Sequence, residues 1–315
     1  MEKIKKFFKV DERGSSIKIE VLGGLTTFLT MAYILFVNPS IMGGMVTDGD
    51  GNPLQLVAGL DLSAVFLATA LAAGLGTIAM GLFAKLPIAL APGMGLNAFF
   101  AYTVVGALGY TWEAALAAVF LSGIFFIVLT VTGFRETIVK AIPNALKHAI
   151  GAGIGLFIAF IGFQNSGIVV NSDATLVTIG DFTQPTVLLA VIGLVITAIL
   201  MAKKVRGGLL LGIIATTIVG IPMGVTDTTM SSFSLNIMPT LGKAFNPGFA
   251  QLFNMENGLV AMLTSVFVVI ISFMLVDMFD TIGTLIGTGA KAGMLDKEGK
   301  LPNMDKALMA DAVAT

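Results

Sequence analysis

The chain has 315 residues, of which 56% are hydrophobic and 12% charged, and its mean hydropathy is +0.94. Soluble domains average roughly 45–50% apolar and about 25% charged residues, so this composition indicates a membrane protein in contact with the lipid bilayer. A formal net charge of −1 argues against nucleic acid as a partner, and the absence of cysteine excludes disulfides and thiolate metal sites. The chain contains no HExxH, GxSxG or paired-histidine pattern, so we expect no enzyme, no metal and no cofactor.

Apolar runs long enough to cross a bilayer recur along the whole chain. They predict an all-α polytopic membrane protein with about eight spans and the start of a ninth near Ala307. The eight runs cover about 19–38, 62–84, 86–106, 114–133, 148–166, 185–202, 207–225 and 258–286. The N-terminal segment lacks the short apolar core of a cleavable signal, so the first span is expected to act as its own insertion signal.

The basic residues test this span count independently, because cytoplasmic loops are enriched in lysine and arginine. If the N-terminus is cytoplasmic, every one of the 18 basic residues except Lys243 falls on the inside. A wrong span count would scramble this alternation. The pattern therefore predicts a multi-pass protein of the cell (plasma or inner) membrane with a cytoplasmic N-terminus. The outside loops at 47–53 and 164–184 are rich in turn-forming residues.

The third apolar run is a poor candidate for one continuous helix. Pro87 and Pro92 each remove a backbone donor, and residues before proline favour extended geometry. We expect an extended segment near 87–93 and a half-helix that starts near Met94. Non-helical backbone at membrane depth persists only where it is buried in protein or lines a cavity.

The start of this half-helix is a candidate binding site, because it aims free N–H groups and a positive dipole end at the break. Gly95 frees the backbone there, and the Asn97 side chain in the first turn can both donate and accept hydrogen bonds. A phenylalanine near the break, Phe99 or Phe100, could stack on a flat ring. The alternative interpretation is a proline-kinked packing helix that Asn97 merely caps.

The eighth run is uncharged from residue 258 to 276 and then contains Asp277 and Asp280. A carboxylate within a membrane helix costs about 2.5–3.5 kcal/mol on insertion scales, which favours a functional role. A spacing of three puts both acids on one helical face, and Thr281 continues the polar stripe. Burial and mutual repulsion disfavour two charges, so we expect at least one acid to carry a proton near neutral pH. The alternative is that each acid bonds neighbouring backbone in a purely structural role.

With these residues assembled, the chain resembles the nucleobase–cation symporter 2 superfamily, and within it the adenine/guanine/hypoxanthine permease branch, which is xanthine/uracil permease-like. The strings that carry the resemblance are spread over the whole chain and are long. They are GGLTTFLTMAYILFVNPSIM (23–42), APGMGLNAFFAY (91–102), LKHAIGAGIGLFIAFIGFQNSGIV (146–169), VDMFDTIGTLIG (276–287) and NMDKALMADAVAT (303–315).

The resemblance implies a transporter fold of fourteen spans in two inverted seven-span repeats, of which this chain holds the first part. A core domain would comprise 1–134 (spans 1–4) and 258–315 (span 8 and the start of span 9). A gate domain would comprise 135–225 (spans 5–7), and 226–257 would be an extracellular loop. The chain resembles a C-terminally truncated permease, and we expect that this piece alone does not transport.

The resemblance further implies proton-coupled uptake of purine bases: hypoxanthine, guanine or adenine. Carried over residue by residue, Asp280 would bind the base, Asp277 would be a second essential acid, and Asn97 would be the contact from the third span. The coupling ion is expected to be a proton taken up by Asp280 and Asp277. A homodimer stays open, as does a carrier of the same fold for uracil, xanthine or a small anion. Acids at the site repel anions, which argues against the last of these, and an acid-lined cation channel lacks any pore-repeat signature.

Overall fold

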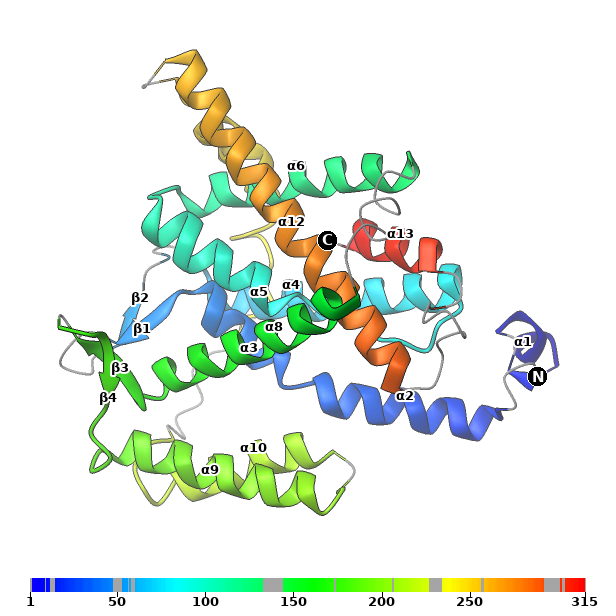
Figure 1. Cartoon of the computed structure of the whole chain (residues 1–315), viewed down its shortest axis with the longest axis vertical. Helices are drawn as coiled ribbons and strands as arrows, with labels where there is room; N and C mark the ends of the chain where they lie inside the picture. The colour runs from blue at the N-terminus through cyan, green and yellow to red at the C-terminus, as the bar shows by residue number, and fades with distance from the viewer. Residues whose placement is uncertain are drawn as a thin grey trace. The chain divides into compact units, whose positions relative to one another are not determined.

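The structure is a computed structural model, and it shows a predominantly helical chain (Figure 1). The residues that it describes are 2–8, 10–11, 15–47, 53–55, 57, 60–132, 144–172, 174–205, 207–226, 234–255, 258–291, 301 and 304–314. They fall into two compact units, which we describe separately. The first unit comprises Met1–Val37, Met45–Gln55 and Ile158–Ser234, and the second comprises Asn38–Gly44, Leu56–Phe157 and Leu235–Thr315. The expected core and gate domains remain predictions.

The first unit contains helices and two small antiparallel strand pairs. The helices are α1 (Glu2–Phe7), α2 (Ile17–Met31), α9 (Pro185–Ala202) and α10 (Gly208–Gly220). The strand pairs are β1 (Met45–Thr47) with β2 (Pro53–Gln55), and β3 (Val169–Ser172) with β4 (Leu176–Ile179). Both pairs lie in loops for which the sequence predicts turns only, because strands of three or four residues are too short to show a period-two pattern.

Helices α9 and α10 approach each other closely at glycines. A Cβ atom on Gly193 of α9 would lie 2.6 Å from Thr216 Oγ1, and one on Gly212 of α10 would lie 3.0 Å from Thr197 Cβ. Small residues that let two backbones approach are the usual contact of helices packed within a bilayer, where water provides no hydrophobic drive between them. Helix α9 begins with Pro185, whose missing N–H has no intrahelical partner at that position anyway.

The second unit holds the predicted break and the acidic helix. Its elements are α4 (Leu62–Ala79) continued by the π-helix η2 (Met80–Ala84), α5 (Met94–Ala98) continued by the π-helix η3 (Phe99–Ala107), α6 (Trp112–Val131), η4 (Ala244–Gly248), α11 (Phe249–Leu252), α12 (Leu259–Lys291) and α13 (Met304–Ala314). Two helices divide between the units: α3 (Ile34–Met42) and α8 (Asn144–Asn165). Hydrogen bonds from the N-terminal N–H groups to the side chains of Asp61 and Thr111 cap α4 and α6.

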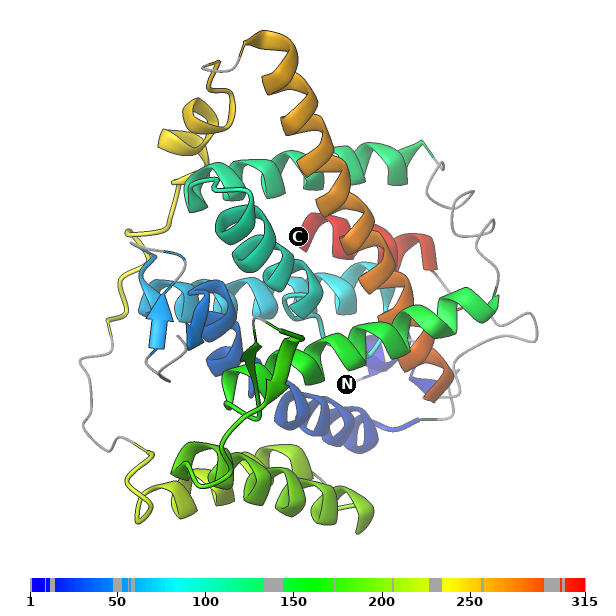
Figure 2. The ribbon, with the colours of Figure 1, turned by 60° about the vertical axis from the view of Figure 1, so that its left-hand side comes forward.

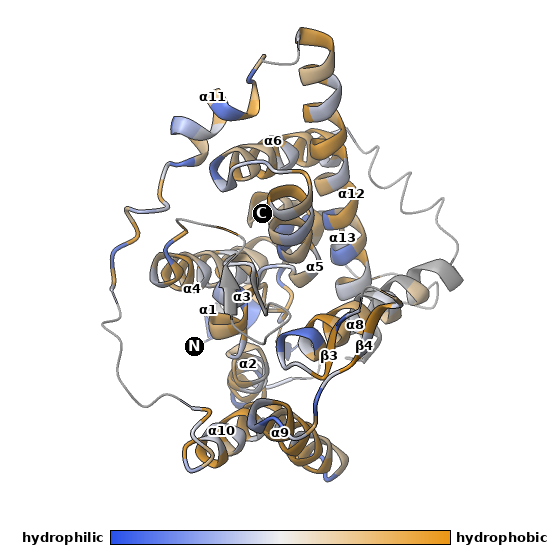
Figure 3. Ribbon diagram, turned by 90° about the vertical axis from the view of Figure 1, so that its left-hand side faces the viewer, coloured by the Kyte–Doolittle hydropathy of each residue, from blue (hydrophilic) through white to orange (hydrophobic). Residues whose placement is uncertain are grey.

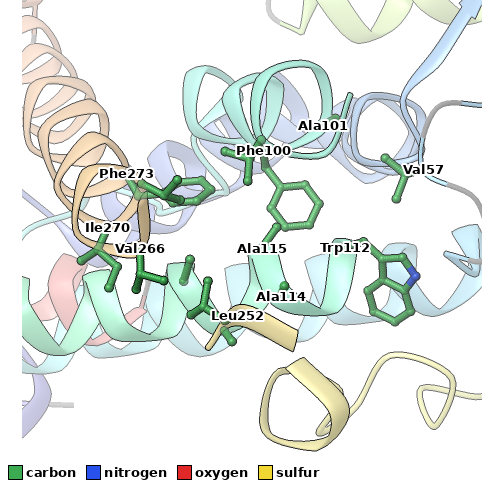
Figure 4. Packing of buried hydrophobic residues seen from close by; sticks show 14 of the residues in the cluster. Val57, Phe100, Ala101, Trp112, Ala114, Ala115, Leu252, Val266, Ile270 and Phe273 are labelled. Carbon is green, nitrogen blue, oxygen red and sulfur yellow. The ribbon is translucent and has the colours of Figure 1, made fainter. Parts of the chain in front are cut away.

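The largest hydrophobic cluster joins η3, α6 and α12 (Figure 4). Phe100 of η3 and Phe273 of α12 are fully buried in it, and α6 contributes a run of small residues that includes Ala114 and Ala115. Because alanine side chains leave room for bulky neighbours, α6 can lie close to both helices without leaving voids. This packing holds α12 in place beside the broken span.

Five helical segments among the described residues are long and apolar enough to cross a bilayer. They are Ile17–Met42, Leu62–Ala84, Trp112–Val131, Pro185–Ala202 and Leu259–Leu285, and shorter apolar helices cover Met94–Ala107, Gly155–Asn165 and Gly208–Gly220. Large apolar side chains such as Leu75, Val131 and Val260 are exposed on these helices, and Figure 3 shows hydrophobic residues distributed along them. Apolar exposure on this scale is normal towards lipid and rare in soluble proteins. The chain is a multi-pass membrane protein, whereas the count of eight spans and the orientation stay predictions.

The ends of some predicted spans differ from the structure. The first span, predicted as one helix, is two helices, α2 and α3, separated at Ala32 and Tyr33, and α3 continues through Pro39 to Met42. A proline in a helix removes one backbone hydrogen bond but does not always end the helix. The ninth helix begins at Met304, three residues before the predicted start. The segments 133–143, 227–233 and 292–300 lie outside the described residues.

Candidate functional site

The third apolar run is broken where the sequence predicts the break. Residues 85–93 are not helical, and α5 begins at Met94. Gly93 precedes α5 with extended backbone angles (φ −70°, ψ 117°), and the first intrahelical bond runs from the Asn97 N–H to the Gly93 carbonyl at 3.0 Å. The prediction of a half-helix that starts at Met94 is therefore confirmed.

The non-helical segment is held by one hydroxyl group of the preceding helix. Thr77 Oγ1 of α4 accepts a hydrogen bond from the Leu90 N–H at 3.0 Å and lies 3.2 Å from the Leu90 carbonyl oxygen, to which it donates. Leu86 and Ile88 are buried in a second hydrophobic cluster with side chains of η2, α12 and α13. Non-helical backbone in a membrane protein needs such partners, because lipid offers it none.

Asp280 lies directly against the start of the half-helix. Its Oδ2 atom occupies the space that a Cβ atom on Gly93 would need, so only glycine at position 93 admits this approach. The Asp280 side chain is partly buried, and among the described residues it has no hydrogen-bond partner. A carboxylate held beside a helix start, with its oxygens unengaged there, can accept hydrogen bonds from a ligand.

A second group of polar residues lies on the same helix and on α13. Asp277 is 9% exposed and Thr281 is 7% exposed. Thr281 Oγ1 lies 2.8 Å from the Asp277 carbonyl oxygen and 2.5 Å from Asp311 Oδ2 of α13, the helix beside α12 in Figure 2. Asp311 is also close enough to Asp280 for the two carboxylates to repel each other when both are charged. Asp311 of α13 is therefore linked to both Thr281 and Asp280 of α12.

The Asn97 side chain is connected to two earlier helices. Its amide nitrogen donates a hydrogen bond to Asn38 Oδ1 of α3, and Asn38 Nδ2 lies 2.6 Å from Thr69 Oγ1 of α4. Asn38 and Thr69 are both buried, at 5% and 3% exposure. Each is a polar side chain within an apolar run, but no local pattern in the sequence marks either residue as part of the site.

The remaining predicted site residues also lie at the contact between the broken span and α12. The Phe99 ring packs edge-on against Phe273 at 5.0 Å between centroids. A Cβ atom on Gly95 would lie 4.0 Å from Val276 Cγ1, which is an ordinary contact. The structure thus places Asp280, Gly95 and Phe99 at the contact between the broken span and α12. The Asn97 side chain bonds Asn38 of α3, and Thr281 faces Asp311 of α13. Among the described residues, no group of three His, Cys, Asp or Glu side chains could hold a metal ion.

An acid on a bilayer-length helix, facing the break in a second helix, is the architecture of a membrane carrier, in which broken helices supply polar groups at membrane depth. Residues 18–315 match the model of the Permease family (Xan_ur_permease), and the chain therefore belongs to this family. The match covers all of the elements that build the site.

Comparison with individual proteins gives a consistent result. The chain is 46% identical to the guanine/hypoxanthine permease PbuG of Bacillus subtilis over 309 residues, which are 98% of this chain and 67% of the relative. It is 42% identical to the adenine permease AdeP of Escherichia coli over 99% of this chain and 65% of the relative. It is 43% identical to the guanine/hypoxanthine permease PbuO of Bacillus subtilis over 98% of this chain and 67% of the relative. The chain spans about two thirds of the length of these relatives.

Proposed function

We propose that the complete protein imports purine nucleobases, namely hypoxanthine, guanine or adenine, across the cytoplasmic membrane together with protons. Its membership of the family and the names of its relatives support the substrate class. The observation that carries the proposal is the position of the Asp280 carboxylate against Gly93, at the start of the half-helix.

Asp280 and Asn97 suit a flat heterocycle with N–H groups and bare ring nitrogens along its edge. A carboxylate accepts hydrogen bonds from such N–H groups, and an amide side chain can both donate and accept. The same pairings let side chains bind base edges in nucleic acids. In this proposal Asp280 accepts from the base, Asn97 and the backbone at Gly95 supply further hydrogen bonds, and Phe99 bounds the plane of the ring.

Proton coupling is proposed for the acids of α12. Asp277 and Asp280 lie on one helix, and Asp311 lies near enough to Asp280 to repel it when both are charged. A proton that binds to Asp280 or Asp311 relieves the repulsion between them. A base that binds at Asp280 changes how strongly the two acids hold that proton. Coupling requires that proton binding and base binding favour the same state of the carrier, which shared use of Asp280 provides.

A carrier of the same fold for uracil, xanthine or a small anion is the alternative. A small anion would need a cation or free N–H groups at the break, whereas the carboxylate of Asp280 lies there. Uracil and xanthine carry similar N–H and carbonyl edges, and only transport measurements separate them from the other bases.

The test is uptake of radiolabelled hypoxanthine, guanine, adenine and uracil by a strain without its own purine uptake, expressing the complete gene. We expect purine uptake that Asp280→Asn lowers by on the order of tenfold or more at an unchanged protein level, since it removes an ionised acceptor. Asp61→Asn is the matched control: it makes the same chemical change at the cap of α4, and asparagine caps a helix as well as aspartate does. Uptake that survives in Asp280→Asn would refute the assignment of this residue.

Coupling is tested in the same cells by varying external pH and adding a protonophore. Proton-coupled uptake rises as the external pH falls and collapses with the protonophore. Asp277→Asn is expected to lower accumulation against a gradient more than it lowers exchange of base between the two sides. Uptake that follows sodium and ignores the protonophore would contradict proton coupling while leaving the substrate class intact.

A further inference from the structure

A chain of hydrogen bonds runs from the backbone of α4 to the candidate base-binding amide. Thr69 Oγ1 lies 2.7 Å from the Val65 carbonyl oxygen and 2.6 Å from Asn38 Nδ2, and Asn38 Oδ1 lies against Asn97 Nδ2. The three side chains come from α4, α3 and α5, which are separated in the sequence. Asn38 and Thr69 are buried, whereas Asn97 is partly exposed.

The direction of this chain follows from the number of hydrogens. The Val65 carbonyl can only accept, so it takes the single hydroxyl hydrogen of Thr69. Thr69 Oγ1 can then only accept, which requires the NH₂ group of Asn38 on its side. The oxygen of Asn38 therefore faces Asn97, and this oxygen in turn requires the NH₂ group of Asn97. The Val65 carbonyl at one end of this series of hydrogen bonds thus determines the orientation of the Asn97 amide at the other end.

This orientation determines what Asn97 can offer to a ligand. One hydrogen of its NH₂ group is used by Asn38, which leaves the carbonyl oxygen and one N–H. The backbone N–H of Asn97 bonds the carbonyl of Gly93, and Asp280 lies against Gly93. Asn97 therefore follows, by one turn of α5, the residue that Asp280 approaches. An amide rotated by 180° would have nearly the same shape but would exchange its donor and acceptor. Such an exchange would present a different hydrogen-bond pattern to a base.

We propose that Thr69 and Asn38 are positioning residues that hold the Asn97 amide in one orientation and thereby determine which purine edge the site accepts. This proposal rests on the proposed function, because it assigns the discrimination between bases to that same site. Thr69 and Asn38 need not touch the base. They act through Asn97, and their loss frees the amide to adopt both orientations.

The experiment measures Vmax/KM for hypoxanthine, guanine and adenine in cells that express the complete gene. Thr69→Val removes the hydroxyl at nearly constant volume, and Thr69→Ser keeps it. The matched control is Thr264→Val on α12, because Thr264 Oγ1 makes the same bond to a carbonyl four residues earlier (Val260, 2.8 Å) but is exposed to the outside of the bundle. The amount of each variant in the membrane is measured through a fluorescent tag.

We expect Thr69→Val to reduce the ratio of Vmax/KM between the best and the worst base by about tenfold, the effect of one buried hydrogen bond. Thr69→Ser and Thr264→Val are expected to keep the wild-type ratio. If Asn97→Ala retains measurable uptake, adding Thr69→Val to it should change the ratio less than twofold, since the two residues act in series.

Three results would overturn the proposal. The first is a wild-type ratio in Thr69→Val, and the second is an equal loss for all bases. The third is that Thr69→Val and Thr69→Ala both fail to reach the membrane while Thr69→Ser reaches it. That result would assign the series of hydrogen bonds a role in folding alone. Absence of purine uptake by the wild type would instead refute the proposed function, so the two failures are distinguishable.

Discussion

At the scale of single residues, the site depends on one close approach, that of Asp280 to Gly93. A carboxylate within a membrane helix costs insertion free energy. The carboxylate of Asp280 lies where the half-helix α5 begins. The approach requires a residue without a side chain at position 93, whereas Gly95 two residues later has no such neighbour. Of the two glycines in this short segment, only Gly93 is required by a close approach.

This difference predicts unequal effects of alanine at the two positions. In Gly93→Ala the new Cβ would overlap Asp280 Oδ2, which is the end of a side chain and can rotate away without moving α12. We expect purine uptake to fall about tenfold, because forced displacements of this kind typically cost ~1–3 kcal/mol, while the amount of protein in the membrane stays unchanged.

Gly95→Ala is the matched control, since its Cβ would meet only Val276 Cγ1 at 4.0 Å. Its uptake should remain within about twofold of the wild type, because the role proposed for Gly95 belongs to its backbone, which alanine keeps. Uptake and membrane-inserted protein are measured side by side for both variants. Equal effects of the two substitutions would show that the contact with Asp280 does not matter for transport.

The candidate site was partly predictable from the sequence at this scale. Asp277, Asp280 and Asn97 stand out because polar groups within apolar runs are rare. Asn38 and Thr69 also lie in apolar runs but are less conspicuous, since neither is charged and neither lies at a predicted helix break. Asn38 contacts Asn97 across 59 residues of chain, and Thr69 contacts Asn38 across 31 residues, so no local pattern reveals either role.

At the scale of elements, proline and glycine decide where helices break and where they touch. The break in the third run follows from Pro87 and Pro92, and Thr77 of α4 satisfies the freed backbone at Leu90. In the first unit, Gly193 and Gly212 bring α9 and α10 together. The break was predicted from the sequence, whereas the partner of each glycine became known only from the structure.

The contact of α9 with α10 predicts that Gly212→Ala destabilises the protein. Its Cβ would lie 3.0 Å from Thr197 Cβ and 3.2 Å from Thr197 Cα, so the backbone itself must move. Overpacking of this kind typically costs ~1–3 kcal/mol, against a gain of about 1 kcal/mol from replacing glycine in a helix. Thermal unfolding of the complete protein in detergent should show a lower midpoint.

The matched control for this prediction is Gly74→Ala in α4. A Cβ atom at Gly74 has no described neighbour within 4 Å, so the gain in helix propensity should appear alone as an unchanged or slightly higher midpoint. A midpoint for Gly212→Ala at or above that of Gly74→Ala would mean that α9 and α10 tolerate a wider separation.

At the scale of the whole molecule, the chain is a multi-pass membrane protein of the permease family whose orientation is predicted from its basic residues. The complete absence of cysteine from the 315 residues makes this orientation directly testable. Thr175, in a loop predicted outside, and Lys203, in a turn predicted inside, are both exposed. A cysteine at either position is therefore accessible to a reagent on its own side of the membrane.

We expect a membrane-impermeant maleimide to label Thr175→Cys in intact cells and Lys203→Cys only after the cells are permeabilised. The complete protein without either substitution provides the background signal. The reverse pattern would place the N-terminus outside. Labelling of both positions in intact cells would contradict the predicted number of spans between them.

The sequence by itself determined the membrane class, the break at Met94 and the acids of α12, because each depends on composition or on spacing within one segment. Hydropathy, proline chemistry and helical periodicity act over a few helical turns, so they can be recognised in the sequence without the tertiary structure. Only the tertiary structure decided that Asp280 lies against Gly93, that Asp311 joins the acids through Thr281, and that Asn38 and Thr69 bond Asn97 in series. These contacts join distant segments, and which helices pack together is decided by the fit of whole helical faces, to which every residue of each face contributes.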